Sequence, residues 1–103
     1  MTNEEFMIEV ERSHLRSKKL LMRKEKEYSS GRDRLEQFHR AASAQNINPC
    51  EALCGMMAKH FTSVADMCKR PTLYNLRKWN EKLTDLRNYT YLADALVRDL
   101  GVE

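Results

Sequence analysis

Proline and glycine are scarce in this chain of 103 residues, and aromatic residues make up only 8% of it. The two prolines and three glycines are few for a sheet protein with frequent tight turns. Leucine, methionine, alanine, glutamate, lysine and arginine are abundant instead, and these residue types favour helices. The composition therefore predicts an all-α protein.

Long apolar runs are absent as well. No stretch approaches the ~18 apolar residues of a membrane-spanning helix, and the first ten residues, MTNEEFMIEV, are too acidic for a signal peptide. We therefore expect a soluble cytoplasmic protein with no membrane partner. A chain of this length has room for one domain with a modest core, and a second subunit often completes the burial at this size. We expect a homo-oligomer.

Cysteine occurs three times, as Cys50, Cys54 and Cys68. An odd number in a chain without an export signal predicts free thiols rather than a disulfide framework. Cys50 and Cys54 stand one helical turn apart, but Cys68 would lie about 21 Å further along the same helix. That separation argues against a shared zinc site, so we expect core or surface thiols.

Positive charge is concentrated near the N-terminus. The net charge is +3 and the pI is near 8.8, but the stretch 12–26 alone carries seven cations against one carboxylate. Such a stripe suits phosphates, nucleic acid or an acidic partner, and a solvated helix face is the alternative. Its cationic residues are Arg12, Arg16, Lys18, Lys19, Arg23, Lys24 and Lys26.

Periodicity and capping signals predict four helices in a bundle-like arrangement, at about 3–29, 33–44, 49–68 and 75–100. In NINPCEAL, Asn48 is the expected N-cap, Pro49 takes the first helical position and Glu51 reaches back to form a capping box. Gly101 is expected to end the last helix. In the first helix, Ser13 and Ser17 interrupt an apolar face. The last helix carries a regular apolar seam: Trp79, Leu83, Leu86, Thr90, Ala93, Val97 and Leu100.

Polar residues form a second row beside that seam. Glu81, Asp85 and Asn88 follow i, i+4, i+7 spacing, which places them on one face at the edge of the seam. Carboxylates held this close repel one another unless a cation neutralises them, and Mg²⁺ is the usual hard cation for such oxygens. A facing helix that carries Glu51 or Asp66 would complete a site. The alternative is ordinary surface pairing of these acids, with Lys78, Lys82 and Arg87 as their partners.

Three segments together carry a resemblance to a known family: KEYSSGRDRLEQF, EALCGMMAKHFTSVADM and NEKLTDLRNYTYLADAL. They resemble small phage and prophage proteins of the nucleotide-modification-associated branch of the all-α, MazG-like nucleoside triphosphate pyrophosphatase superfamily. The stretch 81–89 is similar to the superfamily helix whose Glu and Asp bind magnesium. The resemblance implies a helical oligomer that splits a nucleoside triphosphate between its α and β phosphates, using Mg²⁺ and water. A phage protein would work in the cytoplasm of the host cell.

In such an enzyme, Glu81 and Asp85 would ligate Mg²⁺, and Glu51 or Asp66 would be a third ligand or the base for an attacking water. The phosphate charge would be balanced by Lys59 and Arg34, with Lys26 as a further candidate. Further substrate-binding candidates are Asn88, for a hydrogen bond to a sugar or base edge, and Tyr28, for stacking on a base. His60 points to the apolar side of its helix, and we expect a buried neutral imidazole there.

One departure from the superfamily pattern supports an alternative function. The superfamily's preceding helix carries a Glu-x-x-Glu pair, whereas here Cys54 follows Glu51 at that spacing. With fewer anionic ligands, metal affinity and hydroxide generation both fall. The alternative is a non-enzymatic phage counter-defence protein, similar to an anti-CRISPR inhibitor. It would bind a host nuclease, or its nucleic-acid-binding surface, through four basic residues, Arg12, Arg16, Lys19 and Arg23.

Overall fold

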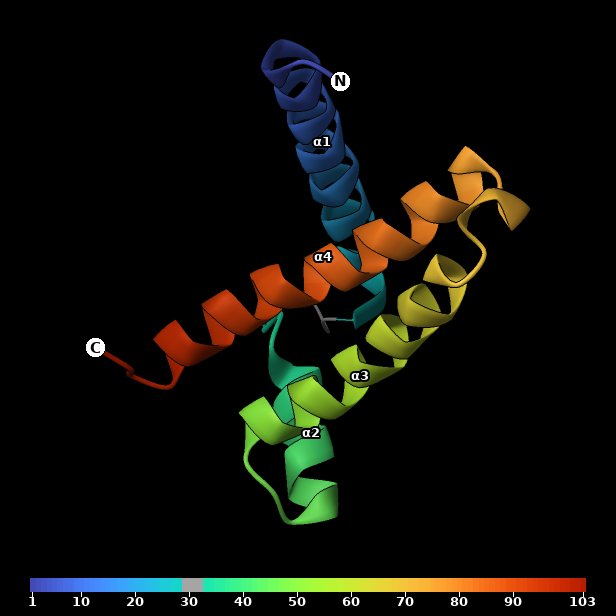
Figure 1. Ribbon diagram of the computed structural model, residues 1–103. Helices are drawn as coiled ribbons and strands as arrows, with labels where there is room; N and C mark the ends of the chain where they lie inside the picture. Colours follow the sequence, from blue (N-terminus) through green and yellow to red (C-terminus); the bar gives the residue numbers. More distant parts are fainter. Residues whose placement is uncertain (29–32) are drawn as a thin grey trace.

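The described part of the protein consists of four α-helices and one short 3₁₀ turn (Figure 1). A computed structural model describes residues 1–28 and 33–103, with side chains for all of these except 26–28, and this part of the chain contains no β-strand. The elements are α1 (Asn3–Tyr28), α2 (Glu36–Gln45), α3 (Pro49–Cys68), η1 (Pro71–Leu73) and α4 (Leu76–Asp99). The all-α prediction is confirmed.

Side-chain caps fix the starts of three helices. At α1, the Thr2 hydroxyl accepts a hydrogen bond from the Glu5 N–H at 3.1 Å. The predicted capping box of α3 is present, with Asn48 Oδ1 accepting from the Glu51 N–H at 3.0 Å and Glu51 accepting in return from the Asn48 N–H. Asn75 caps α4 in the same way, through a hydrogen bond from the Lys78 N–H at 2.8 Å. These short polar side chains satisfy helix N–H groups that have no partner within the helix.

Two other helix ends are set by a residue just outside the helix, Asp33 before α2 and Gly101 after α4. α2 begins at Glu36, three residues later than expected, because Asp33 Oδ1 accepts from the Leu35 N–H at 2.9 Å and holds a turn. Gly101 ends α4 as predicted, with φ +84°, a conformation that glycine adopts at no steric cost. The expected end of the first helix at Ser29 lies outside the described residues.

The hydrophobic core lies where α2, α3 and α4 meet. Phe38 of α2 and Leu96 of α4 are completely buried, and Leu53 of α3 and Leu35 pack with them. Around this centre lie Cys50, Met56, Met57, Tyr89, Leu92 and Ala93, all partly buried. The three cysteines are free thiols, with Cys54 and Cys68 exposed.

α1 is held to α4 by polar side chains. Ser17 is only 1% exposed, and its hydroxyl accepts a hydrogen bond from Arg87 Nε at 2.7 Å. Arg87 Nη2 also donates to the Ser13 carbonyl at 3.3 Å and to Thr84 Oγ1 at 3.1 Å. Asn88 Nδ2 donates to the Ser17 carbonyl at 3.4 Å. The two serines that interrupt the apolar face of α1 are therefore the point at which α4 crosses it.

This crossing corrects the expected seam of α4. Leu83 and Leu100 are exposed, whereas the buried residues of the helix are Thr84, Asn88 and Leu96. α4 lies between α3 and α1, so it buries Leu96 toward the core and its polar pair toward α1. A single seam assumes one buried face, and α4 has two.

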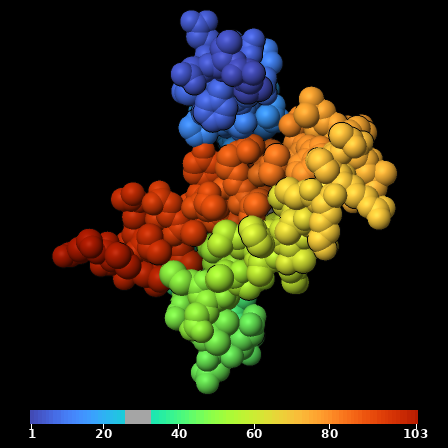
Figure 2. All heavy atoms as spheres, in the orientation of Figure 1, coloured from blue at the N-terminus to red at the C-terminus, as the bar shows by residue number. Residues whose placement is uncertain are grey.

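The molecule is elongated because α1 projects from the rest (Figures 1 and 2). The radius of gyration is 15.5 Å, whereas a compact domain of this length has about 13 Å. Outside its contact with α4, α1 leaves several large apolar side chains in solvent: Phe6, Met7, Ile8, Leu15 and Met22. Among the helices that the structure describes, none combines the length and apolar character needed to cross a lipid bilayer.

A candidate anion-binding groove between α1 and α4

A basic groove of about 550 Å³ runs between α1 and α4. Arg16, Lys19 and Arg23 enter it from α1 at spacings of three and four residues, which places them along one face of that helix. The α4 residues that line the groove also recur at intervals of three and four positions, so they share one face of α4. The full lining is Arg16, Lys19, Leu20, Arg23, Lys24, Arg77, Asn80, Glu81, Thr84 and Asp85, and we call it the basic groove. Five cations thus face two carboxylates.

Glu81 and Asp85 lie one helical turn apart in the wall of this groove. Glu81 is exposed and Asp85 half-buried, and within the described residues neither forms an ion pair. The alternative of ordinary surface pairs with Lys78, Lys82 and Arg87 is therefore not what the structure shows. Arg87 instead lies in the α1–α4 crossing. The two carboxylates remain available to a cation or to the groove's own arginines and lysines.

A smaller polar cavity of about 130 Å³ adjoins the basic groove. Leu20, Lys24 and Asp85 line both spaces. The polar cavity is enclosed by all four helices, and its lining is completed by Leu21, Arg34, Gln37, His60, Asn88, Tyr89 and Leu92. His60 is half-buried here, with its ring centroid 4.9 Å from that of Tyr89. Two sequence-predicted binding residues, Arg34 and Asn88, meet in this cavity.

Among the described residues, two polar atoms of side chains that line the polar cavity are buried without a hydrogen-bond partner. They are Oδ1 of Asn88, an acceptor in a side chain that is 6% exposed, and Nε of Arg34, a donor. The other ends of the same side chains are fixed, since Asn88 donates to the Ser17 carbonyl and Arg34 Nη1 donates to the Leu21 carbonyl at 3.0 Å. A buried polar group without a partner costs about 1–3 kcal/mol. The side chains that line the polar cavity therefore hold one spare donor and one spare acceptor, which a small side-chain movement would present to an incoming molecule.

Arg87 lies in the α1–α4 crossing beside the basic groove and links the two helices that form its walls. Burial above all, and then the positive charge of Arg16, lower the pKa of the Arg87 guanidinium from its ordinary value, and Tyr91 opposes this shift. Arginine nevertheless stays protonated in proteins. Its charge is stabilised by the serine and threonine oxygens that it bridges. The residue thus fixes the distance between the two walls of the basic groove, a role that its position among surface charges did not indicate.

Of the four carboxylates predicted to form one site, only Glu81 and Asp85 line the basic groove. Glu51 is exposed at the start of α3, where its carboxylate is engaged in the capping box. Asp66 is exposed near the end of α3, 3.6 Å from Lys69. Within residues 1–28 and 33–103, no three His, Cys, Asp or Glu side chains come close enough together to hold a metal ion. The expected convergence of Glu51 or Asp66 with Glu81 and Asp85 is therefore not found there, and any metal would depend on oxygens that a ligand supplies.

Two further predicted residues, Lys59 and Arg12, lie outside both the basic groove and the polar cavity. Lys59 is exposed on α3 and lines neither the basic groove nor the polar cavity. Arg12 pairs with Glu9 at 2.8 Å, outside the basic groove. The side chains of Tyr28 and Lys26 lie outside the described residues. Sequence reasoning missed Arg77, although its position four residues before Glu81 places it on the same face of α4.

No protein-family model, no curated protein and no solved structure matches this chain.

Proposed function

We propose that this protein binds a nucleoside triphosphate together with Mg²⁺, with the phosphates in the basic groove and the sugar or base against the polar cavity. One observation carries the proposal. A groove with an excess of cations adjoins a cavity whose lining side chains include, within the described residues, one donor and one acceptor without a partner. A ligand that is anionic at one end and hydrogen-bonding at the other fits both.

The cations supply the affinity for phosphates. Arginine forms paired hydrogen bonds with phosphate oxygens, and lysine contributes a compact charge. Arg16 and Arg23 from α1 face Arg77 from α4, so a polyphosphate chain in the basic groove would contact both walls. The excess of positive charge also attracts anions from solution and raises the rate of association.

The two carboxylates fit a shared metal ion. Mg²⁺ in proteins is commonly held by one or two carboxylates, several waters and the phosphates of the substrate. Glu81 and Asp85 provide the carboxylates, and the absence of a third acid among the described side chains agrees with a metal that arrives with the nucleotide. When bound, the ion would neutralise the phosphates beside these two acids.

Binding is better supported than hydrolysis. A general base must lie within hydrogen-bond reach of the attacking water, directly or through one further water. Glu51 and Asp66, the predicted bases, do not line the basic groove or the polar cavity, and each has a local partner on α3. We therefore propose a nucleotide-binding protein of the pyrophosphohydrolase type that holds its ligand without rapid turnover.

Calorimetric titration with the common ribo- and deoxyribonucleoside triphosphates tests this proposal. The double variant Lys19→Ala with Arg23→Ala removes two charge-assisted contacts to the phosphates. Each such contact contributes about 1.5–3 kcal/mol, so the affinity for the nucleotide should fall at least about tenfold. The matched control is the double variant Arg12→Ala and Lys59→Ala, which removes the same charge outside the basic groove. Equal losses in both variants, or no binding of any nucleotide with Mg²⁺, would contradict the proposal.

The alternative function uses the same cations. Lys19 and Arg23 are exposed, so an acidic protein surface, such as that of a host nuclease, can also reach them. The polar cavity separates the two functions. Gln37→Ala removes an amide that lines that cavity from α2, away from the α1–α4 crossing, and should weaken nucleotide binding while leaving the docking of an acidic protein unchanged. A complex that depends on Arg16, Lys19 and Arg23 but not on Gln37 favours the protein-binding role.

A further inference from the structure

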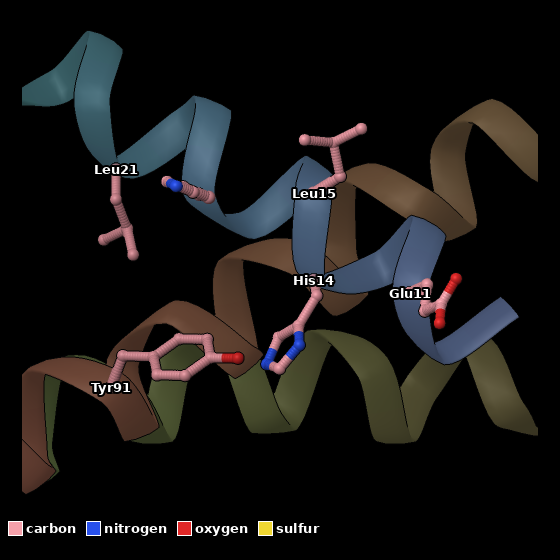
Figure 3. Close-up of a pocket in the computed structure, with 6 residues that line it drawn as sticks. Glu11, His14, Leu15, Leu21 and Tyr91 are labelled. Carbon is pink, nitrogen blue, oxygen red and sulfur yellow. The ribbon is translucent and has the colours of Figure 1, made fainter. Parts of the chain in front are cut away.

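The face of α1 that is turned away from α4 carries an unusual stripe of apolar residues. Ile8, Leu15 and Met22 follow one another at intervals of seven residues and are 48%, 53% and 63% exposed. Seven-residue spacing keeps side chains on one line along a helix that packs against another helix. Figure 3 shows Leu15 on the side of α1 away from α4, while His14 is directed toward Tyr91. Within residues 1–28 and 33–103, the stripe therefore has no apolar surface packed over it.

An apolar groove of about 490 Å³ runs beside this stripe. We give the name apolar groove to the space lined by Glu11, His14, Leu15, Lys18, Leu21 and Tyr91. Within the described part of the chain, Glu11 and Lys18 have no ion-pair partner. Opposite charges thus flank Leu15 along the groove, four residues before it and three residues after it. The apolar groove lies apart from the basic groove, with which it shares no lining residue.

Charge along α1 is divided between its two halves. The stretch 3–15 contains four glutamates and one arginine, whereas 16–25 contains five cations and one glutamate. A helix with an acidic half and a basic half is complementary to a copy of itself that runs in the opposite direction. A copy that runs in the same direction would place like charges side by side, which disfavours the pairing.

We infer that α1 is the interface of an antiparallel homodimer, in which the α1 of a second copy lies along this stripe and the apolar groove. With the twofold axis near Leu15, Leu15 packs against its own equivalent. Ile8 packs against Met22 of the other copy, because these two lie seven residues on either side of Leu15. Glu11 then faces Lys18 of the other copy, and the pair occurs twice, as twofold symmetry requires.

The dimer explains features that one chain leaves unexplained. It covers the stripe of Ile8, Leu15 and Met22, and it pairs Glu11 with Lys18. It also gives α1, which projects from the rest of the molecule and crosses α4 through polar contacts, a second helix to pack on. Since the apolar groove and the basic groove share no lining residue, the inference does not depend on nucleotide binding.

Sedimentation equilibrium over a wide range of protein concentration provides the test. The wild-type protein should approach twice the 12.1 kDa mass of one chain. Leu15→Glu places two like charges at the twofold axis and should raise the dissociation constant by about tenfold or more. Because Leu15 is exposed in one chain, the variant should keep its helical circular dichroism. Leu76→Glu, at another exposed leucine, is the matched control and should leave the dimer unchanged.

Charge exchange tests the direction of pairing. Glu11→Lys alone and Lys18→Glu alone should each weaken the dimer, since each places like charges together across the axis. The double variant Glu11→Lys with Lys18→Glu should restore dimerisation, because both pairs form again with reversed sign. A monomeric wild type, a Leu15→Glu variant that dimerises normally, or a double variant no better than the single ones would each overturn the inference.

Discussion

Arg87→Met is predicted to release α1 from α4 without disrupting the core of α2, α3 and α4. The substitution removes three hydrogen bonds from a charged group, to Ser17, to the Ser13 carbonyl and to Thr84. Hydrogen bonds to charged groups contribute about 1.5–3 kcal/mol each. Arg87 is only half-buried and methionine keeps part of the packing, so we expect a loss of about 2 kcal/mol rather than the full sum.

Amide hydrogen exchange measures this effect where it should occur. A loss of ~2 kcal/mol corresponds to an opening equilibrium about 30 times larger, so the amides of 14–24 should exchange about 30-fold faster. Amides around Leu53 and Leu96 should keep their protection. The matched control is Arg98→Met, which removes an exposed pair with Asp94 and should cost under ~0.5 kcal/mol. Equal changes in the two variants, or unchanged exchange in α1, would refute the role given to Arg87.

Three further predictions concern packing and capping. Phe38→Ala should lower the free energy of unfolding, measured in urea, by about 3–5 kcal/mol. Phe61→Ala, at an exposed site on α3, should change it by less than about 0.5 kcal/mol. Similar losses in the two variants would contradict the core described here. Asn48→Ala removes the α3 cap and should lower the melting midpoint through a loss of about 1 kcal/mol, with nucleotide affinity unchanged. Ser17→Leu overfills the α1–α4 crossing and should cost about 1–3 kcal/mol; a neutral result would show that α1 is not packed closely there.

The helices were predictable because their signals are local. The capping box of Asn48 and Glu51 and the stop at Gly101 depend on residues within a few positions of each other, so the sequence contains the whole interaction. The start of α2 was predicted less well. There the Asp33 side chain competes with the helix by holding a turn, and either conformation satisfies the same backbone groups.

The packing of the helices was harder to foresee. A periodic pattern identifies an apolar face, but α4 buries two faces, and one of them is polar. Ser13 and Ser17 were recognised as interruptions of an apolar face, yet their small size is what allows Arg87 to reach between the helices. The partner of a buried polar residue lies far away in sequence, so periodicity within one helix cannot reveal it.

The candidate site was predicted in part. Glu81 and Asp85 from one hypothesis, and Arg16, Lys19 and Arg23 from the other, line the same basic groove. The two sets were assigned to different functions because the sequence does not show which face of α1 packs against α4. The proposed roles of Glu51 and Asp66 relied on a facing helix, and the rotation of α3 about its axis depends on core contacts that spacing alone does not determine.

The central claim is that the basic groove and the polar cavity together bind one nucleotide, and a nuclear magnetic resonance titration tests it most directly. Backbone amide signals would be followed while a nucleoside triphosphate with Mg²⁺ is added. The account predicts shifts that saturate together at 16–24 of α1 and at 77–88 of α4, with little change around Glu51 and Lys59. Shifts confined to the exposed apolar face of α1, or no saturable shifts at all, would contradict it.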